Sequence, residues 1–565
     1  MAAQTKTDEE KVDSVWKAAA YGDFDALKRY ADESPGILTT PDPDGYHCLQ
    51  WAALNNRVAV ITYLLDQGSD INAIDATGQT ALHWTAVRGA IPALETLLRA
   101  GADISIADSR GYTVCHVAAQ YGQTAVLYHL AMKWGADTDG LDNDERTPLH
   151  WAAYKGFADT ARLLLVIGSR ATLSDREGCT PLHWAAIRGN SDVCTVLLQG
   201  GAVDSLEQPD ATGSTPSQLA IDKGHRLLGL NLAEYRYRKD HTKVLNGPWG
   251  SLAKLHLSPI IWGIVLGMLG MLLYSTIRNP HFPNPSGHTL AAIWMTFALA
   301  FTGLGFLYKT TTADPGFLPR HTAAGVAASR RTASSSSGKN ASSFINNSDL
   351  EHGNQDTMQN TLNSPALWAG QWSQLCVACK IVRPLRAKHC SITDRCVESF
   401  DHYCPWVGNA IGKGNRHLFL IFLWFEFAAV LLSVITAIAR IHTGLLASSE
   451  SSTGEMPGSA LVFPVIFVIF DVFLLISVAA LAIAQASQVS RNVTTNELAN
   501  WHRYKYLHAA NGDFHNPFDQ GCKTNCMEVC YPDRVKGAPY ILSEQQQLSG
   551  ESSGEQELLL SKSDD

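Results

Sequence analysis

Residues 376–412 read CVACKIVRPLRAKHCSITDRCVESFDHYCPWVGNAIG and hold five of the twelve cysteines of the chain. Within this stretch a Cys376-x2-Cys379 pair is followed by His389 and Cys396. Three thiolates and one imidazole are ligands that zinc takes in closed, tetrahedral structural sites. The spacing therefore predicts a zinc ion held by these four residues, and the alternative is that the cysteines are merely small core residues.

A fifth cysteine, Cys404, follows the pair Asp401-His402 in the sequence Asp-His-Tyr-Cys-Pro-Trp. An imidazole next to a thiol can take its proton, and a carboxylate can hold that imidazole in the required tautomer. The pattern predicts a catalytic set in which Cys404 is the nucleophile, His402 the base and Asp401 the residue that orients the base.

These residues resemble a known family. The run Arg383-Pro384-x-Arg386-x2-His389-Cys390, the Asp-His-x-Cys-Pro-Trp motif, Asn409 and Gly412 are similar to the cysteine-rich domain of the DHHC protein S-acyltransferases. Supporting motifs recur at 314–316 (Asp-Pro-Gly), 494–497 (Thr-Thr-x-Glu) and 516–518 (Asn-Pro-Phe). Together with the repeats described below, the chain resembles the ankyrin-bearing subgroup, which includes the huntingtin-interacting animal enzymes and the plant tip-growth type.

The chain departs from the family at a second zinc site. The resemblance implies that this site would use Cys390 and three further positions, which here are Thr393, Tyr403 and Ala410. Three of the four ligands are therefore absent, and we expect one zinc ion per chain. Relatives with Tyr in place of the second His of the motif act as acyltransferases, so the resemblance still implies an enzyme.

Length and charge limit the number of domains and the classes of ligand that the chain can have. The chain has 565 residues, of which 46% are hydrophobic, and its length exceeds that of a single domain. Its opening residues contain no apolar run, which predicts no cleaved signal peptide. A net charge of -9 argues against a nucleic-acid-binding protein. Residues 376–417 are nevertheless basic, which suits a phosphorylated ligand or anionic lipid. The resemblance implies that the phosphates of an acyl-CoA contact some of Arg383, Arg386, Lys388, Lys413 and Arg416.

Residues 15 to about 230 repeat with a period of 33 or 34. The leucine position of a Thr-Pro-Leu-His-x-Ala pattern recurs at residues 49, 82, 115, 149 and 182, with weaker copies before and after. This period predicts an ankyrin array of about seven units. The histidines of the pattern are predicted to form structural hydrogen bonds rather than a metal site.

A row of tryptophans follows the histidines of the repeats. Such a row could line a concave peptide groove or could pack between neighbouring repeats, and the sequence leaves both alternatives open. In related ankyrin acyltransferases an Asn and a Trp of adjacent repeats read a short substrate peptide. The resemblance assigns these positions to Asn55 and Trp84.

Four apolar segments, 258–277, 289–308, 418–438 and 461–484, are each long enough to cross about 30 Å of hydrocarbon. Basic residues flank the ends nearest the repeats, which predicts a multi-pass membrane protein with both termini in the cytosol. The resemblance implies the Golgi, another endomembrane or the plasma membrane. Because acids inside a membrane are costly, we expect Glu426 and Asp471 to face the bundle interior and to share a proton or hydroxyl partners. The alternative is a protonated acid that is satisfied by its own helix.

The predicted fold is dominated by α-helices: an ankyrin-repeat solenoid and a four-helix transmembrane bundle with a small zinc-bound cysteine-rich domain. The expected order is an ankyrin domain (1–235), a basic linker (236–257), transmembrane helices one and two (258–308), the Asp-Pro-Gly motif with a disordered linker (309–370), the zinc domain (371–417), transmembrane helices three and four (418–485), a C-terminal domain with the two later motifs (486–540) and a disordered acidic tail (541–565).

In the C-terminal domain, Cys522, Cys526 and Cys530 recur every fourth residue and would share one face of a helix. This spacing is compatible with lipid attachment at the membrane surface and with a packed stripe.

The resemblance implies a protein S-acyltransferase that moves a long-chain acyl group such as palmitoyl from acyl-CoA, through a thioester at Cys404, to cysteines of proteins recruited by the repeats. The alternative is a catalytically inactive ankyrin scaffold that retains the fold. An ankyrin-bearing channel would show a re-entrant filter segment, and an ankyrin ubiquitin ligase would need a second set of zinc ligands. The sequence shows neither.

Overall fold

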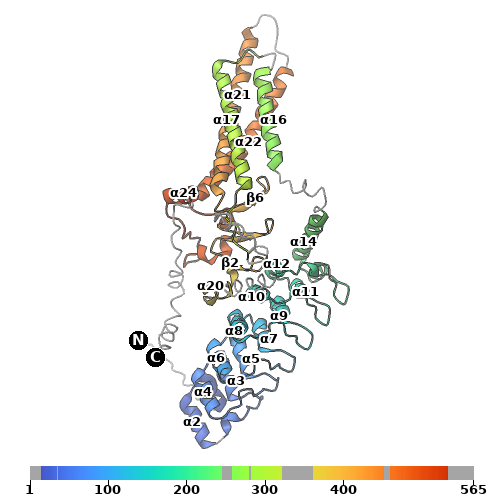
Figure 1. Ribbon diagram of the computed structural model, residues 1–565, viewed down its shortest axis with the longest axis vertical. Coiled ribbons are helices and arrows are strands. Elements are labelled where there is room, and N and C mark those ends of the chain that lie inside the picture. The colour runs from blue at the N-terminus through green and yellow to red at the C-terminus, as the bar shows by residue number, and fades with distance from the viewer. Residues whose placement is uncertain are drawn as a thin grey trace, which may run out of the picture. The chain divides into compact units, whose positions relative to one another are not determined.

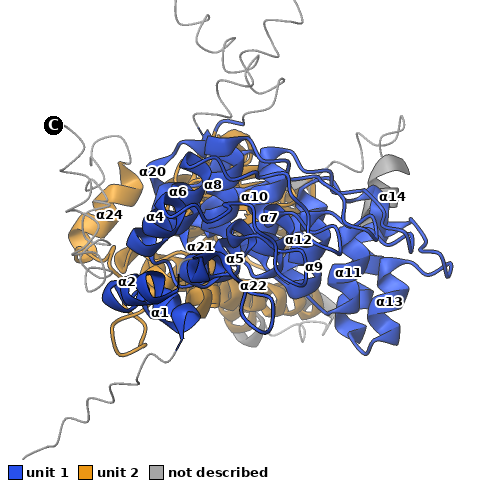
Figure 2. Ribbon diagram, turned by 90° about the horizontal axis from the view of Figure 1, so that it is seen from below, with its two compact units in different colours: residues 1–248, 319–383 blue, residues 249–318, 384–565 orange. Residues whose placement is uncertain are grey.

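The computed structural model describes residues 14–34, 36–244, 258–278, 282–320, 361–450 and 459–531. Figure 1 shows its helices and strands. The chain divides into two compact units, which Figure 2 colours separately: residues 1–248 with 319–383, and residues 249–318 with 384–565. Both units are mostly helical, as the sequence predicts.

The first unit contains the ankyrin array. Its described helices form seven consecutive pairs, which confirms the predicted number of repeats. Buried Leu and Ala side chains of all the repeats join one continuous core, because a single repeat cannot bury its own apolar face. The pairs are α1 (Val15–Tyr21) with α2 (Phe24–Glu33), α3 (Cys48–Leu54) with α4 (Val58–Asp66), α5 (Ala81–Arg88) with α6 (Ile91–Arg99), α7 (Val114–Gln120) with α8 (Thr124–Trp134), α9 (Pro148–Lys155) with α10 (Ala158–Ile167), α11 (Pro181–Ile187) with α12 (Ser191–Gln199), and α13 (Pro216–Asp222) with α14 (Arg226–Val244).

The histidines of the repeats are structural, as predicted. Nδ1 of each ring contacts the threonine that caps its own helix, and Nε2 lies 2.9 to 3.2 Å from a carbonyl oxygen of the following repeat. Burial lowers the pKa of each ring, to about 4 for His150. A neutral imidazole that bridges two repeats explains the row His83, His116, His150 and His183 without a metal.

Residues 361–382 pack against the array of the first unit. They form α20 (Pro365–Trp368), a 3-10 turn (Trp372–Gln374) and the hairpin of β1 (Leu375–Cys376) and β2 (Ile381–Val382). Leu362, Leu367 and Trp372 join the ankyrin core, where the ring of Tyr128 on α8 lies 5.1 Å from that of Trp372. The predicted disorder is therefore wrong for residues 361–370, because their apolar side chains find a surface to cover. The remainder of the predicted linker, 321–360, lies outside the described residues, as does the predicted tail 541–565.

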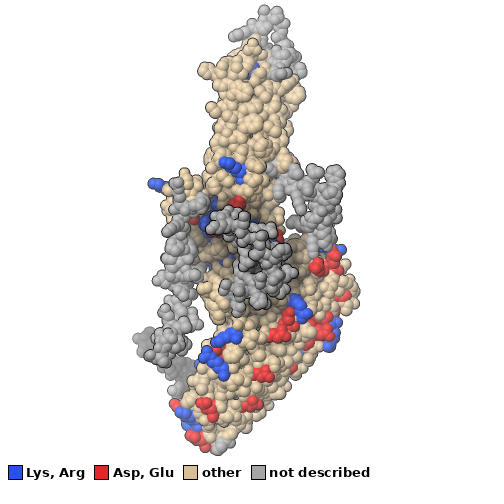
Figure 3. Space-filling model, in the orientation of Figure 1, with Lys and Arg blue, Asp and Glu red and all other residues tan. Residues whose placement is uncertain are grey.

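The second unit contains the apolar helices: α16 (Ser258–Leu273), continued by a π-helical turn (Tyr274–Arg278), α17 (Gly287–Thr312), α21 (Arg416–Glu450) and α22 (Ser459–Ser490). By length and composition α17, α21 and α22 can cross a membrane, and α16 is a shorter apolar helix. Figure 3 shows that the drawn face of these helices is almost free of charged side chains. The protein is therefore an integral membrane protein.

The two acids of these helices face the interior of the bundle, as predicted. Glu426 on α21 is 7% exposed and Asp471 on α22 is 2% exposed. Asp471 has a hydroxyl partner, Ser433, and Glu426 lies against Gly303, where a Cβ would come within 2.6 Å of the carboxyl oxygen. A proton shared between the two acids stays a prediction.

The zinc domain continues in the second unit as two antiparallel strand pairs, β3 (Lys388–Cys390) with β4 (Arg395–Val397) and β5 (His402–Cys404) with β6 (Asn409–Ile411). Asn409 fixes this domain to the end of α17, because its Nδ2 donates to three carbonyl groups there at 2.9 to 3.2 Å. After α22 come α23 (Thr495–Asn500), 3-10 turns at Trp501–Arg503 and Lys505–Leu507, and α24 (Cys522–Cys530).

Candidate active site and metal cluster

The four predicted zinc ligands lie together. His389 and Cys396 face each other across the β3–β4 pair, while Cys376 and Cys379 belong to the β1–β2 hairpin. The ligand atoms of the four residues all lie within 4.8 Å of one another. Tetrahedral zinc with Zn–S bonds of about 2.3 Å separates its ligands by about 3.8 Å, so the donor set fits one zinc ion. Among the residues that the structure describes, no other group of three or more such side chains has this spacing.

Three of the four positions that the resemblance assigns to a second zinc site lie in or against one apolar cluster. Cys390, Val397, Phe400 and Ala410 are buried together, and the ring of Tyr403 packs against them. Tyr403 and Ala410 are direct partners across the β5–β6 pair. These positions are therefore packed with apolar side chains, and the absence of a second zinc ion stays a prediction.

Strand β5 places the predicted catalytic residues and the packing residue Tyr403 on opposite faces. Alternate residues of a strand point to opposite faces, so His402 and Cys404 share one face while Tyr403 points to the apolar cluster. Nδ1 of His402 lies 2.6 Å from Oδ2 of Asp401, and the His402 ring also forms a hydrogen bond with the Cys404 side chain. Cys404 is 8% exposed and Asp401 1% exposed. The predicted nucleophile, base and orienting carboxylate are thus adjacent in the order that the chemistry requires.

Asp401 is held in its ionised form. Its Oδ1 accepts a hydrogen bond from the backbone N–H of Thr495 at 2.8 Å, and its Oδ2 accepts one from the Thr495 hydroxyl at 2.8 Å. The guanidinium of Arg416 lies 3.3 Å from Oδ1. Burial alone would raise the pKa of Asp401, but the hydrogen bond to His402 and the charge of Arg416 outweigh it and hold this pKa well below its usual range.

Sequence reasoning missed the residues that support Asp401. Thr495 belongs to the Thr-Thr-x-Glu motif, yet it lies 94 residues away along the chain, and nothing in the spacing links the two. Gln485, near the end of α22, donates to the Thr495 hydroxyl at 3.1 Å. In the sequence, the only indication of a role for Gln485 is that it is a polar residue at the end of an apolar span.

Two of the predicted phosphate contacts have another role. Arg386 forms a buried ion pair with Glu497 at 2.8 Å, and Arg416 is buried beside Asp401. Because both guanidinium groups are engaged in these buried ion pairs, the predicted contact of Arg386 and Arg416 with the acyl-CoA phosphates is wrong. Of the other cations, Lys388 donates to Asn496, Lys413 pairs with Glu398 and is 44% exposed, and Arg383 donates to the carbonyl groups of Ser373 and Gln374.

All four apolar helices reach the surroundings of Cys404. The buried cluster around its thiol contains residues of α17, α21 and α22, and side chains of α16 pack against it: Leu304, Leu307, Phe419, Phe422, Leu423, Ala482, Ile261 and Trp262. A thiol at the end of an apolar bundle can react with a group whose long hydrocarbon chain lies among the helices.

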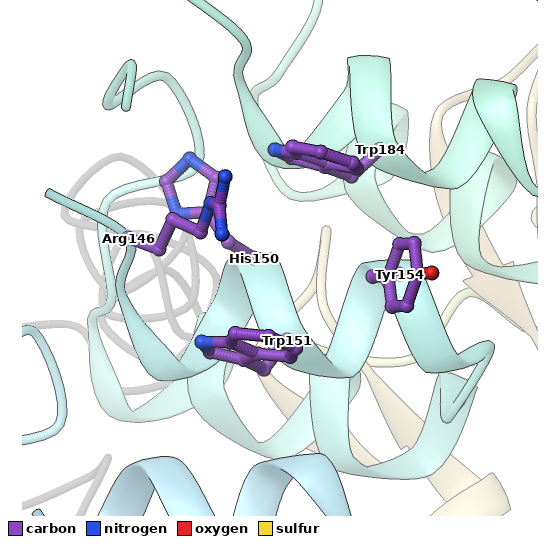
Figure 4. Close-up of a pocket in the computed structure, with 5 residues that line it drawn as sticks. All are labelled: Arg146, His150, Trp151, Tyr154 and Trp184. Carbon is purple, nitrogen blue, oxygen red and sulfur yellow. The ribbon is translucent and has the colours of Figure 1, made fainter. Parts of the chain in front are cut away.

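In the ankyrin array the tryptophan rings pack against aromatic rings of neighbouring repeats, which was one of the two alternatives, and a peptide groove stays a prediction. Each indole N–H donates to the aspartate nine residues before it, at 2.8 to 3.1 Å, as Trp84 does to Asp75. The rings also line cavities. Figure 4 shows one of about 200 Å³, lined by Arg146, His150, Trp151, Tyr154 and Trp184. Trp84 lines a smaller one with Trp51 and Tyr46, while Asn55 caps α3 through a hydrogen bond to the carbonyl of Trp51.

The site predicts a pH-dependent stability. Burial alone would lower the pKa of His402, but Asp401 and Cys404 raise it from 6.5 to about 9. Because the folded state binds this proton more tightly, its stabilisation is complete below pH 6.5 and is lost as the pH rises through 9. We expect the difference in melting temperature between wild type and His402→Gln, measured in detergent, to shrink across this window. The exposed His502→Gln is the control. A wild-type versus His402→Gln difference that stays constant from below pH 6.5 to above pH 9 would contradict the assignment.

The fold and site together define a class: an integral membrane protein that joins an ankyrin array to a zinc-type domain with a cysteine, histidine and aspartate site. A family model described as DHHC palmitoyltransferase matches residues 371–502, and a model of ankyrin repeats matches residues 15–108, 92–172 and 165–240. The chain belongs to the DHHC palmitoyltransferase family and is an enzyme of that family.

Two relatives match over almost the whole chain. The chain is 36% identical over 533 residues to "Probable protein S-acyltransferase 23" of Arabidopsis thaliana, which covers 93% of this chain and 94% of the relative. It is 27% identical over 591 residues to "Palmitoyltransferase ZDHHC17" of Rattus norvegicus, which covers 93% of this chain and 88% of the relative. Both matches are long enough to include the repeats, the helices and the site.

Proposed function

We propose that the protein transfers a long-chain acyl group, such as palmitoyl, in two steps that both pass through Cys404. In the first step His402 takes the thiol proton, the sulfur attacks the thioester carbonyl of acyl-CoA, and CoA leaves as the thiol. In the second step a cysteine of a protein substrate attacks the Cys404 thioester and collects the acyl group, while Cys404 regains a proton. Asp401 orients the imidazole and stabilises its charged form.

One observation carries this proposal: the hydrogen-bonded chain from Asp401 through His402 to Cys404, located where the apolar helices end. A carboxylate 2.6 Å from Nδ1 leaves Nε2 of the ring for the proton of the thiol. The apolar cluster gives an aliphatic chain a medium like its own, and each CH₂ kept there contributes about 0.8 kcal/mol. A nucleophilic thiol next to the apolar side chains of the helices therefore suits an acyl donor with a long hydrocarbon chain.

The remaining parts support the same reaction. One zinc ion held by Cys376, Cys379, His389 and Cys396 would brace the strands that carry the site and would take no part in the transfer itself. Four spans, 258–277 included, would surround the acyl chain, with the site and both termini in the cytosol of a Golgi, other endomembrane or plasma membrane. Lys413, Lys388 and Arg383 remain the candidates for contact with the CoA phosphates.

The repeats would recruit the protein substrate through a short unstructured peptide. We expect Trp84→Ala to weaken binding of the best ligand from a peptide array by about 2 kcal/mol, or roughly 30-fold, because a partly exposed aromatic ring acts as a hot spot. Trp184→Ala is the matched control: it removes the same kind of indole–aspartate hydrogen bond, outside the repeats of Asn55 and Trp84, and should keep its affinity for the peptide. Self-acylation of Cys404 should not change in either variant. Equal loss of peptide binding and self-acylation in Trp84→Ala would instead indicate misfolding.

Incubation with an alkyne analogue of palmitoyl-CoA tests the enzyme against the scaffold. The enzyme should acquire a label that hydroxylamine removes and that depends on Cys404. A chain that binds partners through its repeats yet never labels at Cys404 would instead be an inactive scaffold.

A further inference from the structure

Helix α24 (Cys522–Cys530) carries a row of three cysteines spaced one helical turn apart. Cys522 and Cys530 are exposed, and Cys526 is partly buried. Cys522 and Cys526 are close enough for their side chains to form a hydrogen bond. Because residues four apart share a helix face, the three thiols form one line, which we call the thiol row.

A different face of α24 docks onto the end of α22. Asn525 is fully buried, and its Nδ2 donates to the carbonyl oxygen of Ser490 at 2.8 Å. Glu528 accepts a hydrogen bond from Asn492 at 2.9 Å. Asn525 lies about 100° and Glu528 about 160° around the helix from Cys526, the middle of the thiol row, so docking leaves Cys522 and Cys530 exposed.

This docking places the thiol row beside the membrane surface. Ser490 is the last residue of α22, a helix that can cross the bilayer, and α24 is hydrogen-bonded directly to it. Lys523 on α24 and Arg491 just after α22 add positive charge near this end, which suits the anionic lipids of a cytosolic leaflet. An acyl chain attached to the row would therefore have hydrocarbon within reach.

Other uses of three thiols fit less well. Cys522 and Cys530 are eight residues apart, or about 12 Å along the helix axis, which is too far for both to bind one ion. A structural disulfide is not expected in the reducing cytosol. A packed stripe would be buried, whereas two of the three thiols are exposed.

We propose that the thiol row is itself S-acylated, with the acyl group supplied by the thioester at Cys404. This inference rests on the proposed function. A row sulfur attacks the acyl carbonyl on Cys404, a new C–S bond forms, and the C–S bond to Cys404 breaks. The row thiol loses its proton to His402 or water and Cys404 regains one, so no oxidant or reductant is needed. The attached chains then hold the C-terminal domain, which supports Asp401 through Thr495, against the membrane.

The test counts thioesters on the full chain expressed in cells. Free thiols are blocked, thioesters are opened with hydroxylamine, and each new thiol receives a polymer tag that shifts the protein on a gel. We expect wild type to show several tags, the triple variant C522S/C526S/C530S to keep only the tag at Cys404, and Cys404→Ser to show none. Asn525→Ala, which undocks α24, should lose tags from the row, whereas Met527→Ala on an exposed part of the same helix should not.

The failures are distinguishable. If Cys404 is tagged but the triple variant carries as many tags as wild type, the inference is overturned and the proposed function stands. If Cys404→Ser still carries tags on the row, a different enzyme supplies the acyl group, which overturns the inference as stated. If neither Cys404 nor the row is ever tagged, the proposed function itself fails.

Discussion

Replacement of Cys404 by serine is expected to lower acyl transfer by at least about 1,000-fold while leaving the metal in place. A hydroxyl loses its proton far less readily than a thiol, so His402 has no usable nucleophile to activate. The residue is 8% exposed and makes no contribution to the metal cluster, and serine has nearly the same volume. Hydroxylamine-sensitive labelling with alkyne palmitate and metal analysis of the same sample measure both effects.

Cys390→Ala is the matched control for this experiment. Cys390 is also a buried cysteine of the zinc domain, but it packs in the apolar cluster with Val397 and Phe400 rather than beside His402. We expect this variant to keep both its label and its metal. Label that persists in Cys404→Ser would show that another residue carries the acyl group.

The second large effect concerns the metal. We expect purified protein to contain one zinc ion per chain, and Cys376→Ser or His389→Ala to lose it and to unfold the domain. A structural zinc contributes about 10 kcal/mol, which is comparable to the whole stability of a small domain. The strands here are only two or three residues long and cannot replace that energy. Elemental analysis and limited proteolysis of each variant provide the measurement.

Thr393→Ala serves as the control for metal loss, because this residue occupies a position of the family's second site but offers no ligand there. It should retain one zinc and resist proteolysis as wild type does. Two zinc ions per chain would show that residues other than Cys390 complete a second site, and the apolar cluster around Tyr403 would then need another explanation.

The order of the parts was predictable from the sequence. The 33-residue period, the apolar segments and the Cys-x2-Cys, His and Cys spacing are local patterns, because a repeat, a span or a zinc knuckle is specified by residues close together in the chain. The adjacency of Asp401, His402 and Cys404 is equally local, since a strand places His402 and Cys404 on one face. For these features the spacing of residues already implies their geometry.

Tertiary structure decided which polar groups serve the site. Thr495 forms hydrogen bonds with Asp401 although the two residues are 94 positions apart in the chain. Arg386 and Arg416 form internal ion pairs, whereas the local excess of positive charge in the sequence predicted a phosphate site. Residues 361–370 fold onto the ankyrin array although their surroundings in the sequence are polar. The physical reason is the same in each case: burial removes a charged or apolar group from water, and only packing between segments far apart in the chain determines which partner compensates for it.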